Sequence, residues 1–206
     1  KGGQESLKKE IITLVENAAI EGFSALNAQA LREKIEDIRK VKKAFVRFST
    51  DGLVIVNVIE RKEAVVFFNN DKYEVLDGNG VILSIKQNYE GLSSLPLLVG
   101  KDASKNINAL LALVNEIGSY QSEVLYYEWV GERRWDIHMK SELVFKLPES
   151  NLNKGLEIMR MFLHETDKLS NPVVSVDLRN IDKPIIRFRK APPVEYIQKN
   201  RRRLAG

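Results

Sequence analysis

The stretch from Leu53 to Leu83 limits the fold more than any other part of the chain. It predicts three extended segments joined by two turns. In residues 53–59 the side chains alternate between two faces, Val54, Val56 and Val58 on one and Leu53, Ile55 and Ile59 on the other. Because both faces are apolar, we expect this strand to be covered on at least part of each face. The run Asp77-Gly78-Asn79-Gly80 tolerates positive φ angles and indicates a tight turn.

The residues before this stretch predict two helices and one more strand. Apolar residues recur at helical spacing from about Glu5 to Ala19, which indicates a first helix. Asn27 is a candidate N-cap for a second helix. A strand over residues 44–48 then turns at Asp51-Gly52 into the long stretch. Two helices on one face of a small mixed sheet predict an α+β domain.

After Leu83 the elements start again and predict a second, mostly antiparallel sheet with two helices. The helices are expected at residues 103–117 and 152–165, each with one apolar face. The strands are expected at residues 123–130, 133–140, 143–147, 172–179 and 184–190. The chain is therefore predicted to hold two domains, residues 1–78 and 79–191. A polar, basic tail over residues 192–206 follows, and we expect it to be flexible.

The last predicted strand has an apolar character that nothing downstream is predicted to cover. Ile185, Ile186 and Phe188 are interleaved there with Arg187 and Arg189. An apolar strand with an unpaired side is either a docking edge or an aggregation hazard, and charged residues on such a strand also serve as edge protection. Both interpretations stay open at this point.

The sequence offers no set of side chains that points to catalysis. It has no cysteine, which excludes disulfides, thiolate zinc sites and cysteine nucleophiles. Asp136 and His138 share a strand face, but no candidate nucleophile is placed near them, so a structural pair is favoured over an acid–base couple. His164, Glu165 and Asp167 lack the spacing that brings three metal ligands together. We therefore predict no enzyme, no catalytic residue, no metal and no cofactor.

Aromatic and basic residues raise the alternative of a nucleic-acid binder. Tyr126, Tyr127, Trp129 and Trp135 lie on adjacent predicted strands, where they would stack either on bases or on one another. The net charge of +4 comes partly from the tail, residues 199–203. Cross-strand pairing and a solvated terminus are the commoner explanations. We expect no nucleic-acid partner.

Several motifs occur in the order found in a known family. They are Glu60-Arg61 after a strand, Tyr73 to Gly80 with its Asp-Gly landmark, Leu95 to Gly100, Trp135-Asp136-Ile137 and Val176 to Arg179. With these motifs, nearly the whole chain resembles the bacterial cell division family FtsQ, called DivIB in other bacteria. It departs from the family at Glu63, where proline is usual, and at Lys40 to Lys43, which replaces a frequent Pro-Trp-Val.

The resemblance implies a POTRA domain, here with a truncated first strand, followed by the family's β domain. It also implies a single-pass protein of the bacterial inner membrane. One transmembrane helix would lie upstream of this chain, and this region would face the periplasm at the division septum. The expected role is a non-enzymatic scaffold of the divisome that helps recruit and regulate septal peptidoglycan synthesis.

The resemblance also implies partners. FtsB and FtsL-like proteins are expected to add a strand to the last strand of the β domain, and other divisome members to contact the POTRA domain. The residues expected to bind the partner are Arg179, Asn180, Pro184, Ile185, Ile186, Arg187, Phe188 and Arg189. The alternative is a POTRA-containing transport or chaperone component that binds client peptides at a sheet edge.

Overall fold

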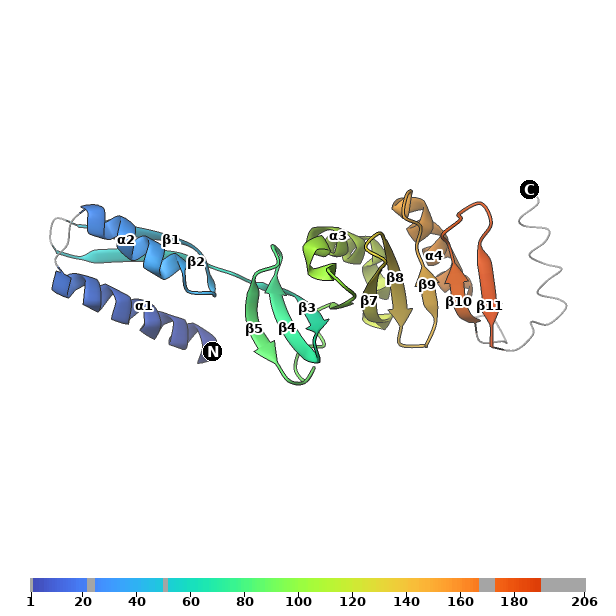
Figure 1. Cartoon of the computed structure of the whole chain (residues 1–206), viewed down its shortest axis with the longest axis horizontal. Coiled ribbons are helices and arrows are strands. Elements are labelled where there is room, and N and C mark those ends of the chain that lie inside the picture. Colours follow the sequence, from blue (N-terminus) through green and yellow to red (C-terminus); the bar gives the residue numbers. More distant parts are fainter. Residues whose placement is uncertain (1, 22–24, 50–51, 167–172, 190–206) are drawn as a thin grey trace. The chain divides into compact units, whose positions relative to one another are not determined.

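The computed structural model describes residues 2–21, 25–49, 52–166 and 173–189 (Figure 1). Contacts divide the chain into two compact units, Lys1–Ala64 with Val75–Ile85 and Val65–Glu74 with Lys86–Gly206. The predicted α+β class is confirmed. The predicted tail, residues 192–206, lies outside the described residues. The predicted domain boundary after residue 78 stays a prediction.

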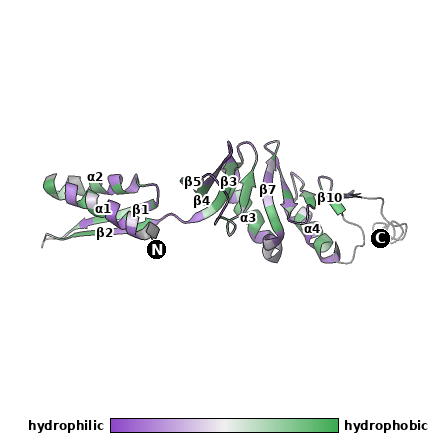
Figure 2. Cartoon of the chain, turned by 90° about the horizontal axis from the view of Figure 1, so that it is seen from below, coloured by the Kyte–Doolittle hydropathy of each residue, from purple (hydrophilic) through white to green (hydrophobic). Residues whose placement is uncertain are grey.

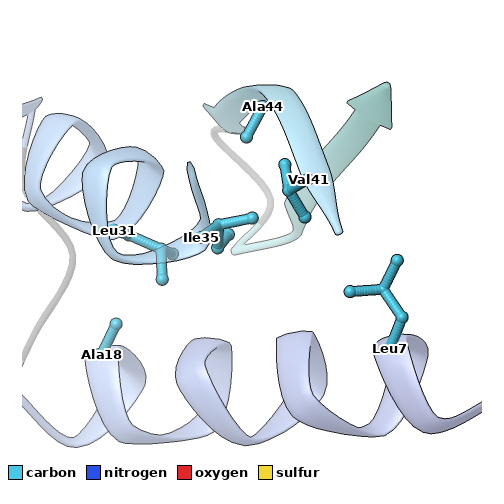
Figure 3. Packing of buried hydrophobic residues seen from close by; sticks show 6 residues of the cluster. All are labelled: Leu7, Ala18, Leu31, Ile35, Val41 and Ala44. Atoms are coloured by element: carbon cyan, nitrogen blue, oxygen red, sulfur yellow. The ribbon is translucent and has the colours of Figure 1, made fainter. Parts of the chain in front are cut away.

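The chain starts with two helices and a pair of antiparallel strands. These are α1 (Gly2–Glu21), α2 (Ala25–Glu36), β1 (Val41–Phe48) and β2 (Val54–Glu60). Both helices share one apolar core with one face of the strand pair, and Figure 3 shows its buried members facing one another. They are Leu7, Ala18, Leu31, Ile35, Val41 and Ala44. The predicted helices are confirmed, because their apolar residues recur at helical spacing.

Two local predictions in this region are wrong. Asn27 is no N-cap, because α2 already begins at Ala25. Ala25 and Leu26 are good helix formers, and the helix therefore begins two residues before Asn27. The strand β2 is covered on one face instead of two. Its valines pack on the helical core, whereas Ile55 and Ile59 are 44% and 49% exposed. The reason is that both helices contribute to the core on the same side of the strand pair.

The middle of the stretch from Leu53 to Leu83 is a hairpin, so the stretch holds four strands and not three. Strands β3 (Glu63–Asn69) and β4 (Lys72–Asp77) are joined by Asn70 and Asp71, which have φ angles of 47° and 58°. Asn and Asp tolerate this left-handed region better than other non-glycine residues, and it suits tight hairpins. The last strand of the stretch is β5 (Ile82–Lys86).

The predicted turn at Asp77 is confirmed, and the Asp77 carboxylate holds it together. Its Oδ1 accepts hydrogen bonds from the backbone N–H groups of Asn79 and Val81, at 2.8 and 2.9 Å. Its Oδ2 accepts one from Arg61 Nη1 at 2.8 Å. The two landmarks Glu60-Arg61 and Asp77-Gly78 thus meet through a buried carboxylate.

Strands β3 to β11 form one nine-stranded sheet in the order β11-β10-β9-β8-β7-β6-β3-β4-β5. The strands after β5 are β6 (Leu97–Val99), β7 (Val124–Val130), β8 (Arg134–Met139), β9 (Val144–Lys146), β10 (Val173–Asp177) and β11 (Ile185–Phe188). The sheet is mixed, because β3 pairs with β6, β6 with β7 and β9 with β10 in parallel.

Two of the parallel pairings are crossover connections through a helix. The helix α3 (Ile107–Ile117), with short 3₁₀ turns at Ala103–Asn106 and Gly118–Glu123, joins β6 to β7. The helix α4 (Leu152–Thr166) joins β9 to β10. Parallel neighbours need such long connections, since a tight turn can only reverse the chain. Both helices lie on the same face of the sheet (Figure 2), and Arg160 of α4 donates to the Glu116 carbonyl of α3 at 2.6 Å.

A substitution of Gly100 tests the close approach of β6 and β7. Gly100 has a φ of 117°, and an added Cβ would lie 2.4 Å from the Trp129 carbonyl oxygen. We expect Gly100→Ala to lower the free energy of unfolding by about 2–3 kcal/mol, because the Trp129 backbone of β7 cannot easily move away from the added Cβ. Gly91→Ala is the control, because Gly91 has a positive φ but open space around it. Equal losses of stability in chemical denaturation would contradict the clash.

The second prediction concerns the charge of Asp77. Burial raises the pKa of this carboxyl, but the hydrogen bonds from Val81, Arg61 and Asn79 outweigh it, and the net pKa is lowered. A lowered folded-state pKa stabilises the protein above the ordinary pKa of Asp, and this contribution is lost as the pH falls below about 4. We expect Asp77→Asn to cost about 2 kcal/mol at neutral pH.

The pH dependence and a control make this test specific. The difference in unfolding free energy between wild type and Asp77→Asn should shrink as the pH falls from about 4 through the lowered pKa of folded Asp77, because the carboxylate then loses its charge. Asp102→Asn removes the partner of Lys105 in a surface ion pair and should leave the stability nearly unchanged. If the difference in unfolding free energy between wild type and Asp77→Asn stays constant down to low pH, the charge of Asp77 does not contribute to stability through these hydrogen bonds.

Candidate protein-binding edge

The strand β11 is the outermost strand at one end of the sheet (Figure 1). It pairs antiparallel with β10, and among the described residues no strand pairs with its other side. Every second N–H and C=O group of an edge strand points away from the sheet. An extended peptide that added a strand at this edge would use such outward-pointing groups.

A single row of apolar side chains crosses the sheet and ends on this strand. Its members are paired neighbours on seven consecutive strands: Phe67, Leu98, Tyr127, Ile137, Phe145, Val176 and Ile186. The first six are buried, and Ile186 is half-buried. The row lies in the core under α3 and α4, where Phe145 meets Phe162 of α4 edge to face. Ile186 is its last member among the described residues.

The other face of β11 carries its most exposed residues. Ile185 is 65% exposed and lies opposite Asp177 of β10, and Arg187 is exposed opposite Ser175. Just after the strand, Arg189 forms an ion pair with Glu142, from the turn between β8 and β9. Of the predicted binding residues, Pro184, Ile186 and Phe188 are half-buried and the others are exposed.

The turn between β10 and β11 is fixed by side chains that accept hydrogen bonds from nearby groups. The Asp177 carboxylate accepts from the Arg179 backbone N–H at 3.1 Å and from the Arg179 guanidinium at 2.6–3.0 Å. These bonds lower the pKa of Asp177, against the effect of burial. Asn180 Oδ1 accepts from the Asp182 N–H at 3.1 Å. Arg179 and Asn180 thus hold the hairpin in shape, although their side chains are exposed.

The acid–base couple, the disfavoured interpretation of Asp136 and His138, does not form. Asp136 is buried and bonded to Arg134 at 3.0 Å, while His138 Nε2 lies 2.8 Å from Glu128 and stacks on Tyr126. Each residue therefore has its own structural partner on the open face of the sheet.

Among the described residues, no three His, Asp or Glu side chains gather as metal ligands; Asp167 lies outside them. None of the described helices is long and apolar enough to cross a membrane.

The aromatic side chains of β7 and β8 pair with one another, as the cross-strand interpretation predicts. Trp129 lies opposite Trp135 with ring centroids 4.7 Å apart, and both Trp135 and Tyr127 are buried. Because they are buried, Tyr127 and Trp135 cannot stack on nucleic-acid bases. The Tyr127 hydroxyl has no hydrogen-bond partner among the described residues, and burial raises its pKa.

Two features of this edge were missed in the sequence. The first is the anchoring role of Asp177, for which the signal was an acidic residue two positions before Arg179 in a turn. The second is the ion pair between Glu142 and Arg189, which has no signal because the two residues are 47 positions apart. Long-range pairs of this kind depend on strand order, which periodicity alone does not give.

Comparison with known proteins now identifies the family. The model of the C-terminal domain of cell division protein FtsQ/DivIB matches residues 64–179, which is more than half of the 206 residues. The chain belongs to the FtsQ/DivIB family. This match includes β3 to β10 and ends at Arg179, just before β11. The predicted family is thereby confirmed, and with it a role in cell division.

Two sequence relatives, both named cell division protein FtsQ, agree with this assignment. The chain is 27% identical over 188 residues to cell division protein FtsQ of Agrobacterium fabrum, which covers 91% of this chain and 59% of that protein. It is 29% identical over 165 residues to FtsQ of Rhizobium radiobacter, covering 80% and 78%. The extracytoplasmic domain of DivIB from Geobacillus stearothermophilus aligns with a TM-score of 0.39 and 14% identity, over 53% of this chain and 97% of that one. The chain thus spans about three fifths of the Agrobacterium protein.

The anchoring role of Asp177 leads to a prediction. We expect Asp177→Ala to lower the free energy of unfolding by about 1 kcal/mol, because the carboxylate is mostly buried but its partner Arg179 is half exposed. Amide hydrogen exchange at residues 179–183 should become faster than in wild type. Asp182→Ala is the control, since Asp182 is exposed and takes part in the turn through its backbone N–H. Unchanged exchange in Asp177→Ala would rule out the anchoring role.

Proposed function

We propose that this protein is a non-enzymatic scaffold of the divisome that binds a partner strand on β11. Membership of the FtsQ/DivIB family supports the cell division role. The observation that carries the binding mode is the edge position of β11, whose one neighbouring strand within the described chain is β10. Peptides commonly bind sheet edges through backbone hydrogen bonds, and alternating side chains give specificity.

The apolar row suggests what the partner strand would offer. An added strand would bring one side chain beside Ile186 on the helix-covered face, where it would extend the buried row. An apolar residue suits that position, because it would remove both its own surface and that of Ile186 from water. The next residue of the partner would lie on the open face near Ile185 or Arg187. An alternating apolar and polar segment fits this arrangement.

The partners in this proposal are FtsB and FtsL-like division proteins. Their binding through residues 179–180 and 184–189 would help recruit and regulate septal peptidoglycan synthesis. Other divisome members would contact the POTRA domain, which corresponds to residues 1–78. In the proposed topology one upstream transmembrane helix anchors the protein in the bacterial inner membrane, and this region faces the periplasm at the septum. These points rest on the family assignment.

Proline substitutions on β11 test the strand addition. Because backbone N–H groups alternate in direction, one of the adjacent residues Ile186 and Arg187 donates to β10 and the other points outward. Ile186→Pro and Arg187→Pro are made separately, and the variant whose melting temperature is nearer to wild type identifies the outward donor. We expect this variant to bind a purified FtsB–FtsL segment at least roughly tenfold more weakly in calorimetry, because proline lacks the donor and its ring hinders an added strand.

Two controls separate the backbone effect from others. Arg187→Ala removes the side chain and keeps the N–H, so it shows how much of any loss comes from the charge. Ile85→Pro makes the same change on β5, the strand at the opposite end of the sheet, and should leave the affinity unchanged. The proposal fails if the outward proline variant of β11 binds the segment as tightly as wild type.

A further inference from the structure

The strand pair β1–β2 has one face that none of the described helices covers. Six side chains lie on it by their alternation and register, namely Lys43, Phe45 and Arg47 of β1 and Ile55, Asn57 and Ile59 of β2. We call these six residues the outer face. Phe45 is 49% exposed, Ile59 49% and Ile55 44%. Contiguous large apolar side chains in solvent usually mark a contact surface.

The charges on the outer face are all positive. Lys43 and Arg47 flank Phe45 on β1, and the Lys43 ammonium lies 5.1 Å from the centre of the Phe45 ring. This contact keeps the cation over the apolar patch. The six positions include no carboxylate, and the nearby Glu36 accepts a hydrogen bond from the Ala44 N–H instead. An apolar and anionic partner would therefore match this surface.

The size of the outer face limits what kind of partner fits. Eight residues of strand span about 26 Å and two strands are about 10 Å wide, so the face measures on the order of 260 Å². A stable protein interface buries roughly 800 Å² on each side. A second copy of this chain is also disfavoured, because face-to-face packing would bring cations together without carboxylates. A flat, fluid surface needs neither a larger area nor a shaped groove.

We propose that the outer face of β1–β2 binds the surface of a membrane that contains anionic lipids. Lys43 and Arg47 contact the lipid phosphates, and Phe45, Ile55 and Ile59 insert among the headgroups. Aromatic and aliphatic side chains next to cations are the combination that interfacial membrane segments use. Cations near an anionic surface each add to the attraction. This binding is separate from strand addition to β11, and neither depends on the other.

Vesicle flotation with the purified 206-residue chain tests the proposal. Vesicles of phosphatidylcholine alone are compared with vesicles that also contain phosphatidylglycerol. We expect binding to the anionic vesicles to be roughly tenfold stronger and to fall as salt rises from about 50 to 500 mM. The double variant Phe45→Ser/Ile59→Ser should bind anionic vesicles roughly tenfold more weakly. Its melting temperature should stay near that of wild type, because both side chains are half exposed.

A charge-matched control separates the outer face from other cations. Lys43→Glu/Arg47→Glu and Lys8→Glu/Lys9→Glu change the net charge equally, and Lys8 and Lys9 are exposed on α1. Only the first pair should abolish flotation. Equal losses in both pairs would mean that net charge alone attracts the chain, and would overturn the proposal.

Two further outcomes would also overturn it. One is wild-type binding that is the same with and without phosphatidylglycerol. The other is a dimer of the wild-type chain in sedimentation that Phe45→Ser/Ile59→Ser dissociates, with no flotation of either protein. A failure here leaves the proline test on β11 unaffected, because that test uses a soluble peptide segment.

Discussion

The row of apolar side chains from Phe67 to Val176 is the constraint on which the rest of the sheet depends. It fixes the register of six neighbouring strands, because a slip of one residue would turn each buried side chain to the open face. It also fixes where α3 and α4 lie, since the row needs a cover. The position of β11 follows from the same row: Ile186 continues it by one step, and the described chain offers no further strand.

In both units, the described helices cover one face of the strands and leave the other face open (Figure 2). In the sheet, α3 and α4 cover one face, and the open face carries polar pairs such as Glu128 with His138 and Arg134 with Asp136. In the first unit, α1 and α2 cover one face of β1–β2, but the other face carries Phe45, Ile55 and Ile59. On the open face of the sheet, these polar side chains bond to one another. On the second open face, the apolar side chains stay exposed to solvent, as is typical of a contact surface.

Much of this could be predicted because the signals are local. Helical spacing predicted α1, α3 and α4, and alternation predicted the two faces of β2. The Asp-Gly run predicted the turn at Asp77, although the bond from Arg61 comes from 16 positions away. The hairpin at Asn70-Asp71 was missed, since Asn and Asp reach positive φ less often than glycine and leave a weaker signal.

The sequence by itself determined most of the helices and strands, and which family the motifs indicate. Only the tertiary structure decided the mixed strand order and the ion pairs between distant residues such as Glu142 and Arg189. The tertiary structure alone decided that one face of β2 is exposed to solvent. The physical reason is that periodicity reports which side of an element is apolar, whereas burial depends on which other elements pack against that side.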